Sequence, residues 1–496
     1  MPDTSGSPAP SFLIDGFVTE SGDQLDHAII RYSTAGTMNV SRDNVVLVPS
    51  HYMATVEDSA WMIGPGKAID TDRYFVVSTE LFGNGRSSSP STTAAPHDGP
   101  RFPIVTIRDS VHAVYRLLRE ELGVEHLRAV VGFSMGAMQA FQWAVSYPDF
   151  MDLVIPICGN ARSYPHGNVR LEGLITTLRL DPAYANGDYD TQPADGVAAF
   201  GLAWAPWLYS QEWWRRELWL EVDPGATYES VVDSFRTDFL PGADANDIVL
   251  QCRTWQRHDV GTTPGFAGDT RAALRSIQAR VLYLPSETDL YFPLGDARFE
   301  STAIPNVTLT PIPSLWGHPA GSAVTDADAQ FVSRAISGFL TDGENATDET
   351  DAVDEADATD DLPGQYLQIL ALLLAGIANE TIGVMSDEAL AKIQETFDLA
   401  LQAISLHSIP GLHEHGWNVV FDIVDNCPDT ELSTATRPAL ELAVTRFSNT
   451  TIAQVADWDL LTERYSEFKA AIAARNPSRT TAAINDLYQL PSDAAT

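Results

Sequence analysis

A serine flanked by glycines, placed between a predicted strand and a predicted helix, is the feature that most restricts how this chain can fold. Residues 127–148 read LRAVVGFSMGAMQAFQWAVSYP, in which an apolar run leads through GFSMG into a small-residue helix. A chain that reverses from strand to helix within one residue crowds its backbone, so positions two before and two after the serine cannot carry side chains. A bare G-x-S-x-G also occurs as an ordinary glycine-rich turn, but this context favours a nucleophile elbow. The pattern therefore predicts that Ser134 is a nucleophile and that the N–H of Met135 points toward a developing oxyanion.

Apolar segments on both sides of this elbow predict a sheet made mostly of parallel strands. Residues 12–34 alternate apolar and polar side chains, which predicts two antiparallel strands joined at residues 21–23. Strands are expected at residues 44–49, 74–78, 152–157, 280–285 and 306–312, those at 44–49 and 152–157 being buried, and helices at 107–122 and 326–340. Strands that alternate with helices at this spacing indicate a parallel sheet covered on both faces. The expected fold class is therefore α/β.

Residues 160–275 differ from the segments around them. They contain no clear buried strand, much helical periodicity and six of the chain's 11 tryptophans. We interpret this segment as a helical lid inserted above the serine. Its tryptophans can line an acyl pocket, but packing in a core is the favoured interpretation for most of them.

An acidic segment divides the chain. Residues 341–361 hold ten acidic residues and no basic one, so they cannot bury apolar surface and are expected to form an extended linker. The chain from 362 to about 490 shows helical patterns throughout. The sequence therefore predicts an α/β domain at 12–340, a linker at 341–361 and an all-α domain at 362–490.

The charge balance is strongly acidic, with 67 acidic and 30 basic residues and a net charge of -37. One interpretation is an acidic surface for a cationic partner. The favoured one is adaptation to very high salt, because the acid is spread over the whole chain and only three of the basic residues are lysines. Nothing resembles a basic stripe, so nucleic acid is not an expected partner.

Other sequence features bear on location and on covalent chemistry. No run of 18 apolar residues predicts a membrane span, and the start of the chain lacks the features of a signal peptide, so we expect a cytoplasmic protein with no membrane partner. Cys158, Cys252 and Cys427 are too far apart in sequence to suggest a metal spacing or a disulfide framework.

Candidates for the acid and the base follow the serine in sequence. A serine hydroxyl needs a histidine to take its proton, and the histidine needs a carboxylate to fix its tautomer. Asp289, in PSETDLYFP, and His318, in SLWGHPAG, both follow predicted strands, in the order that an elbow architecture uses. Glu287 and Asp296 compete with Asp289, but only Asp289 is followed by an apolar Leu-Tyr-Phe-Pro run. We therefore predict a catalytic triad of Ser134, Asp289 and His318.

Three motifs together resemble a known family. IGPGKAIDTDRYFVV at 63–77, GFSMGAMQAFQWAVSYPD at 132–149, and SETDLYFP with a later GH closely resemble the homoserine O-acetyltransferase-like family of α/β-hydrolases. The likeness covers about residues 12–340 and implies an α/β-hydrolase fold, with a mostly parallel sheet and a helical lid. It places the family's triad on Ser134, Asp289 and His318, and its oxyanion donors on Met135 and on Met53 in the loop SHYM.

The chain also departs from that family's pattern. True homoserine acetyltransferases usually read GGSMGG at the elbow, where this chain reads GFSMGA, and the loop ELFGNGRSSSPS at 80–91 replaces a glycine-rich loop with a cysteine. The lid arginine that holds the carboxylate of homoserine would fall on Gly201 or a neighbour. A buried carboxylate needs a cation, and Arg162, Arg170 and Arg215 are the alternatives elsewhere in the lid. The pattern is more similar to the esterase-type members.

The expected activity is serine acyl transfer by a ping-pong mechanism through an acyl-Ser134 intermediate. An acyl group would pass from a thioester or an ester to an alcohol or to water, with no cofactor, although acetyl-CoA can serve as an acyl-donor substrate. A plain carboxylesterase of short acyl esters is one alternative. A ligand-sensing protein with a hydrolase-like scaffold is a second, and the intact triad argues against it.

The C-terminal segment weakly resembles another family. RYSEFKAAIAARNPSRTTAAINDL is similar to the helical ligand-binding domain of GntR-type transcription regulators, which often bind a metal through histidines. His407, His413 and His415 lie close together in sequence, but two or three neighbours do not make a complete site, and we predict no metal. A role in forming a homodimer is preferred to ligand sensing.

Overall fold

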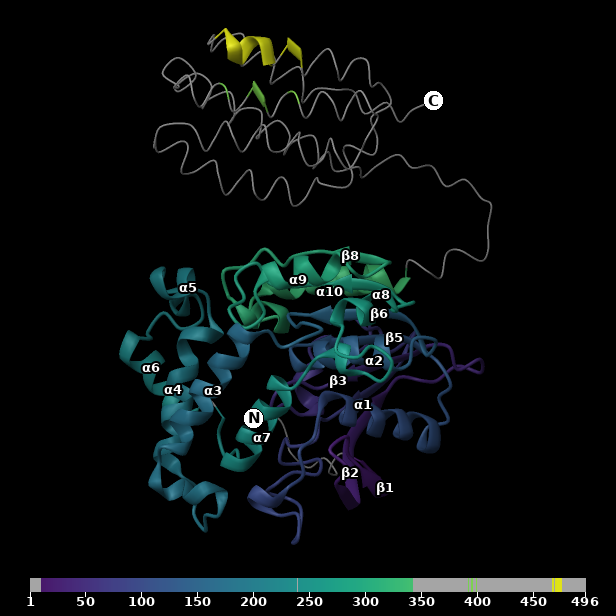
Figure 1. The fold of residues 1–496 in the computed structure, drawn as a ribbon, viewed down its shortest axis with the longest axis vertical. Helices are drawn as coiled ribbons and strands as arrows, with labels where there is room; N and C mark the ends of the chain where they lie inside the picture. Colours follow the sequence, from purple (N-terminus) through teal and green to yellow (C-terminus); the bar gives the residue numbers. More distant parts are fainter. Residues whose placement is uncertain are drawn as a thin grey trace. The chain divides into compact units, whose positions relative to one another are not determined.

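The computed structural model describes residues 10–238 and 240–341, together with short helical pieces at 391, 394–395, 398, 466–467 and 469–474. The chain divides into two compact units, residues 1–349 and 350–496 (Figure 1). The site and its supporting elements lie in the first unit. The expected linker after Thr341, most of the segment that resembles GntR-type regulators, and the three C-terminal histidines lie outside the described residues.

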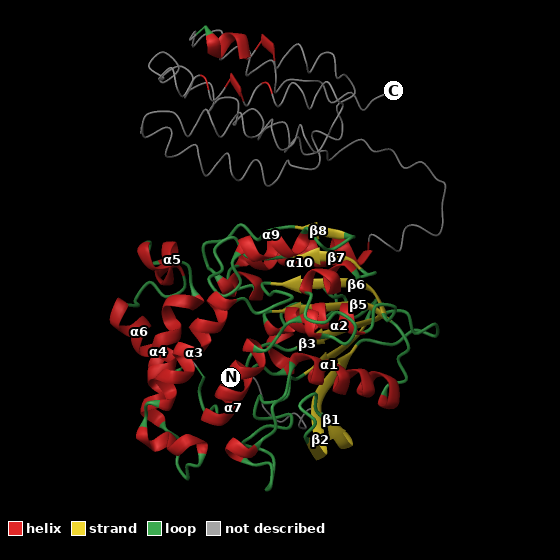
Figure 2. Cartoon of the chain, viewed as in Figure 1, coloured by secondary structure: helices red, strands yellow, loops and turns green. Residues whose placement is uncertain are grey.

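An eight-stranded sheet forms the centre of the first unit, with its strands in the order β1-β2-β4-β3-β5-β6-β7-β8 (Figure 2). The strands are β1 Ser11–Val18, β2 Gln24–Ala35, β3 Val45–Pro49, β4 Phe75–Thr79, β5 Leu127–Phe133, β6 Met151–Ile157, β7 Arg280–Tyr283 and β8 Val307–Leu309. β1 and β2 pair antiparallel, as do β2 and β4, whereas the remaining neighbours pair parallel. The mostly parallel sheet and the hairpin expected at residues 12–34 are therefore confirmed.

Alternating residues of the central strands pack into two separate cores, one on each face of the sheet. In β3, Val45 and Leu47 belong to the core that contains α1 (Ile107–Arg116) and α2 (Met135–Ser146). Val46 and Val48 point the other way, into the core that contains α10 (Asp326–Thr341). Because successive side chains of a strand point to opposite faces, a strand buried on both faces reads as a continuous apolar run. This is why VVLVP carries no polar residue.

The helices agree with the expectation in kind, with small differences at their ends. The helix expected at 107–122 is α-helical only to Arg116 and continues as a π-helical turn over Leu117–Glu121. Thr106 caps its first turn by accepting a hydrogen bond from the N–H of Asp109. The helix expected at 326–340 is α10. Within the described part of the chain, no helix is both long enough and apolar enough to cross a membrane.

The segment between β6 and β7 consists of helices joined by turns and irregular stretches, and its described residues add no strand to the sheet. Its α-helices are α3 Pro165–Arg179, α4 Ala194–Leu208, α5 Gln211–Arg215, α6 Tyr228–Thr237, α7 Ala245–Gln256 and α8 Thr270–Arg275. In Figure 1, α3 to α6 gather beside one side of the sheet. α9 (Leu294–Ser301) follows β7.

Core packing accounts for one group of lid tryptophans. Trp213 stacks on Tyr209 with ring centroids 3.8 Å apart, and the ring centroid of Trp219 lies 5.2 Å from that of Trp213. Both tryptophans are buried in the α10-side core. The preference for a packing role is confirmed for these residues, whereas Trp204 and Trp255 lie in a different setting, described below.

Candidate active site

Ser134 occupies a strained turn between β5 and α2. β5 ends at Phe133, α2 begins at Met135, and the intervening serine has a φ of 57° and a ψ of -121°. A Cβ at Gly132 would lie 2.0 Å from the carbonyl oxygen of Gly136, and one at Gly136 would lie 2.5 Å from that of Pro49. Backbone therefore fills both places where a side chain would go. Such strain persists only where the surrounding structure enforces it, and it is common at functional sites.

The three side chains chosen from sequence lie in one hydrogen-bonded chain. The Nε2 atom of His318 is 2.9 Å from the Oγ of Ser134, and its Nδ1 atom is 2.7 Å from Oδ2 of Asp289. All three are nearly inaccessible, with exposed fractions of 3% to 5%. A carboxylate on Nδ1 fixes the tautomer in which Nε2 can accept the serine proton.

The backbone holds Asp289 in its orientation. Its second oxygen, Oδ1, accepts hydrogen bonds from the backbone N–H groups of Tyr291, at 2.7 Å, and Phe292, at 3.2 Å. The competing Asp296 instead lies 3.4 Å from the side-chain amide of Asn160. The apolar residues after Asp289, which singled it out in the sequence, thus supply the N–H groups that orient it.

Aromatic rings enclose the imidazole of His318. Ring centroids of Tyr291, Phe133 and Phe292 lie 4.5, 4.8 and 5.5 Å from it. His51, from the loop after β3, contacts Phe133 edge-on, and burial lowers the pKa of His51 to about 4. This second histidine is therefore neutral near pH 7 and adds no competing positive charge beside His318.

The two predicted oxyanion donors differ in their surroundings. Met135 is the first residue of α2, so its N–H has no carbonyl of its own helix to bind. Met53 has a φ of 54°, and its N–H donates to Oε1 of Gln251 at 2.6 Å. The buried Gln251 side chain also donates from Nε2 to the carbonyl of Phe82 at 3.0 Å. An oxyanion at the Met53 N–H would have to share or displace this bond.

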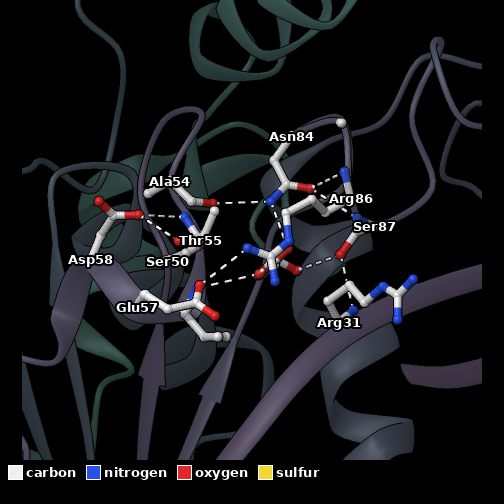
Figure 3. Close-up of polar contacts among 12 residues, drawn as sticks. Arg31, Ser50, Ala54, Thr55, Glu57, Asp58, Asn84, Arg86 and Ser87 are labelled. Atoms are coloured by element: carbon white, nitrogen blue, oxygen red, sulfur yellow. Dashed lines mark hydrogen bonds and ion pairs between the residues drawn. The ribbon is translucent and has the colours of Figure 1, made fainter. Parts of the chain in front are cut away.

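A polar network fixes the loop that carries Met53. Nδ2 of Asn84 donates to the carbonyl of Ala54 at 3.0 Å (Figure 3). It also donates to the buried carboxyl of Glu80 at 2.8 Å. Glu80 also accepts from the N–H of Val56, and Arg86 contacts both Glu80 and Glu57. Burial raises the pKa of Glu80. The segment ELFGNGRSSSPS, which departs from the homoserine acetyltransferase pattern, therefore anchors the 50–57 loop.

Two of the three lid arginines considered as carboxylate anchors are ion-paired, and the third is not. Arg162 pairs with Asp259 at 3.3 Å, and the exposed Arg215 pairs with Glu212. Arg170 is 4% exposed, and none of its three guanidinium nitrogens has a hydrogen-bond partner among the described residues. Gly201, where the resemblance placed the family's arginine, lies buried within α4.

The described residues contain no group of three or more histidine, cysteine or acidic side chains placed to hold a metal. Cys158 and Cys252 are buried free thiols, and Cys427 lies outside the described residues. The sequence did not identify Gln251 or the role of Asn84. Gln251 is 198 residues from Met53, so no local pattern could have linked them.

Comparison with known proteins agrees with this architecture. A family model described as the alpha/beta hydrolase fold matches residues 54–189. A probable esterase of Corynebacterium glutamicum is 35% identical over 305 residues, which cover 60% of this chain and 86% of the relative. A homoserine O-acetyltransferase of Thermobifida fusca is 31% identical over 328 residues, which cover 60% of this chain and 86% of that relative. The structure of the acetyl esterase MekB superposes with a TM-score of 0.65 at 30% identity, covering 68% of this chain and 97% of that one.

Proposed function

This chain belongs to the α/β-hydrolase family that includes such esterases and homoserine O-acetyltransferases, and from that premise we propose that it cleaves short acyl esters through an acyl-Ser134 intermediate. The observation that carries the proposal is the chain of hydrogen-bonding distances from Ser134 through His318 to Asp289. A buried serine, histidine and carboxylate in this order have the arrangement that nucleophilic acyl transfer requires.

In the first step, the Oγ of Ser134 attacks the carbonyl carbon of the ester while Nε2 of His318 takes the serine proton. Asp289 stabilises the imidazolium that forms, because its Oδ2 lies 2.7 Å from Nδ1. The N–H of Met135 stabilises the tetrahedral oxyanion, a contribution typically worth about 10²–10³ in rate for each donor. His318 then protonates the leaving alcohol, and the acyl group stays on Ser134.

In the second step, water or an alcohol takes the acyl group by the same route in reverse. His318 removes a proton from the acceptor, the acceptor attacks the acyl-serine, and Ser134 recovers its proton. This is a ping-pong sequence, because the first product leaves before the acceptor reacts. A thioester such as acetyl-CoA can load the same serine, since the chemistry at the carbonyl carbon is shared.

The Met53 N–H is the second oxyanion donor in this proposal. Its bond to Gln251 keeps the loop in place in the absence of substrate, and the developing negative charge then competes with the Gln251 oxygen for the same proton. A charged oxygen accepts a stronger hydrogen bond than a neutral amide oxygen does. The exchange therefore favours the transition state over the ground state.

Two observations favour water over homoserine as the acceptor. The lid position that resembles the homoserine-binding arginine carries Gly201, so that cation is missing from its place in α4. The solved structure at a TM-score of 0.65 is an acetyl esterase, and the relative at 35% identity is a probable esterase. Acetyl and similarly short acyl esters are therefore the proposed substrates.

A product-partition experiment tests the choice of acceptor. Acetyl-CoA and p-nitrophenyl acetate are offered separately as donors, with and without homoserine, to the wild-type protein and to Ser134→Ala. Free acetate formed by the wild type alone, unaffected by homoserine, supports an esterase. O-Acetylhomoserine that depends on Ser134 would instead identify a transferase.

A further inference from the structure

Arg170 is a buried cation whose hydrogen-bonding groups are unused. It lies on α3, where its Cζ is 4.3 Å from the ring centroid of Tyr291, 4.8 Å from that of Trp255 and 5.5 Å from that of Trp204. Its Nε, Nη1 and Nη2 atoms are all buried and have no hydrogen-bond partner among the described residues. The guanidinium therefore sits in an aromatic cage with its N–H groups unsatisfied.

Leaving these groups unsatisfied is energetically costly. A guanidinium keeps its proton in proteins, and a buried charge without a hydrogen-bonded partner is strongly destabilising. Cation–π contacts to the three rings compensate in part, but aromatic faces do not replace oxygen acceptors for the N–H groups. Elsewhere in this acidic chain, Arg162 contacts Asp259 and Arg253 contacts Glu172. The isolation of Arg170 from any such partner therefore indicates an acceptor that comes from outside the chain.

A second unused donor lies beside the first. The hydroxyl of Tyr291 is buried and has no hydrogen-bond partner among the described residues. The ring that carries it contacts both Arg170, at 4.3 Å from Cζ, and His318, at 4.5 Å between centroids. The unused donors are thus one aromatic ring away from the proposed catalytic base.

The neighbouring polar groups already have partners of their own. Asp289 divides its two oxygens between His318 and the N–H groups of Tyr291 and Phe292. The hydroxyl of Tyr52 donates to the carbonyl of Ile248 at 3.2 Å. Burial lowers the pKa of Arg170, and the negative charge of the nearby Asp289 acts in the opposite direction. No described carboxylate is therefore paired with this cation.

We propose that Arg170 and Tyr291 form a subsite for a carboxylate carried by the ester substrate. The inference rests on the proposed function and adds a substrate class to it. A carboxylate matches the planar guanidinium through two parallel hydrogen bonds, and the Tyr291 hydroxyl supplies a third donor. The carboxylate can belong to the alcohol part of the ester, as in an acetylated hydroxy acid, or to the acyl part, as in a monoester of a dicarboxylic acid.

Two pairs of substrates test the subsite and distinguish these sources. The first pair is 3-acetoxybutyrate and its carboxamide, and the second is phenyl hemisuccinate and its carboxamide. For one pair, the kcat/KM of the wild type should be about 10-fold to 100-fold higher for the carboxylate ester than for its carboxamide. This is the effect expected of charge-assisted hydrogen bonds. The pair that shows the preference identifies which part of the substrate carries the carboxylate.

Variants then assign the preference to these residues. Arg170→Met should remove it, and Tyr291→Phe, which keeps the ring, should reduce it several-fold. Arg162→Met is the matched control, because Arg162 lies in the same lid but already pairs with Asp259, and it should retain the wild-type preference. If Arg170→Met does not fold, inhibition of the wild type by free butyrate and by butyramide replaces it, with butyrate expected to be the stronger inhibitor.

The outcomes separate this inference from the function on which it rests. Ser134-dependent turnover of all four esters without preference for either anion would overturn the subsite and leave the esterase proposal intact. Turnover of no ester would overturn the proposed function. In that case, calorimetric titration of full-length Ser134→Ala with butyrate decides the subsite, because absence of binding contradicts it and binding lost in Ser134→Ala/Arg170→Met supports it.

Discussion

The Nε2 atom of His318 lies 2.9 Å from the Oγ of Ser134, although 184 residues separate the two positions in sequence. Ser134 follows the last residue of β5, and His318 begins a 3₁₀ turn in the segment that follows β8. Both strands belong to the parallel part of one sheet, whose carboxyl ends share an edge. The topology of the sheet, rather than any local pattern, brings the proposed nucleophile and base together.

Replacement of Asp289 by asparagine should lower kcat by about 10³-fold to 10⁴-fold, because an amide can stabilise the wrong tautomer of His318. The N–H groups of Tyr291 and Phe292 can still bind the side-chain oxygen, so the fold should be retained. Steady-state kinetics with p-nitrophenyl acetate measures the effect, and circular dichroism checks the fold. Near wild-type kcat in a folded Asp289→Asn variant would remove Asp289 from the proposed triad.

Alanine at Gly136 should destabilise the protein severely, because its Cβ would lie 2.5 Å from the Pro49 carbonyl oxygen. Gly173, in the middle of α3, is the matched control, since nothing lies within 4 Å of a Cβ there. Alanine at Gly173 should raise the free energy of unfolding by about 0.5–1 kcal/mol. Urea unfolding measures both variants, and equal effects at the two glycines would contradict the crowded elbow.

Replacement of Gln251 by leucine should lower the free energy of unfolding by about 2–4 kcal/mol. The change leaves the part-buried Met53 N–H and the buried Phe82 carbonyl without their side-chain partner. Gln211→Leu, at an exposed position, serves as the control and should change stability little. Thermal unfolding compares the two, and indistinguishable melting temperatures would show that Gln251 does not anchor the loop.

Glu300 should make stability fall as the pH rises from about 4.5 to about 8. Its carboxyl is buried against the N–H of Ala161 and the hydroxyl of Tyr283, and burial raises its pKa from 4.5 to about 8. Between these two pH values the folded state holds a proton that the unfolded state has lost. The free energy of unfolding therefore falls by up to about 1.4 kcal/mol for each pH unit. Below pH 4.5 both states are protonated, so the full stability is present there.

The isosteric variant Glu300→Gln carries an amide, which does not gain or lose a proton over this pH range. Urea midpoints measured from pH 5 to pH 8 should therefore fall less steeply for this variant than for the wild type. Glu229→Gln, at an exposed position on α6, provides the comparison and should keep the wild-type slope. Parallel slopes for Glu300→Gln and the wild type would show that Glu300 does not carry this dependence.

The sequence was informative where one local pattern determined the structure. The elbow, the β1–β2 hairpin and the buried strands followed from glycine spacing and from apolar runs or alternation, because these patterns report burial directly. Ends of elements were less accurate. The last strand was expected at 306–312 but covers only Val307–Leu309, because backbone pairing to β7 decides where it ends.

Relationships between distant segments could not be predicted in this way. The order of the sheet, with β4 between β2 and β3, depends on pairing between strands far apart in sequence. The same is true of the bond from Met53 to Gln251. The sequence left three lid arginines open, and only their neighbours in space distinguish the unpaired Arg170 from the ion-paired Arg162 and Arg215. Homodimer formation and adaptation to high salt stay predictions.

Formation of an acyl-enzyme at Ser134 is the most direct test of the account. Wild-type protein and Ser134→Ala are mixed with p-nitrophenyl acetate, quenched within the first turnovers, and examined by intact and peptide mass spectrometry. The wild type should carry one acetyl group on the peptide that contains Ser134 and should release a burst of p-nitrophenol, and Ser134→Ala should show neither. Undiminished turnover by folded Ser134→Ala, or acetylation at another residue that releases product at the same rate, would contradict it.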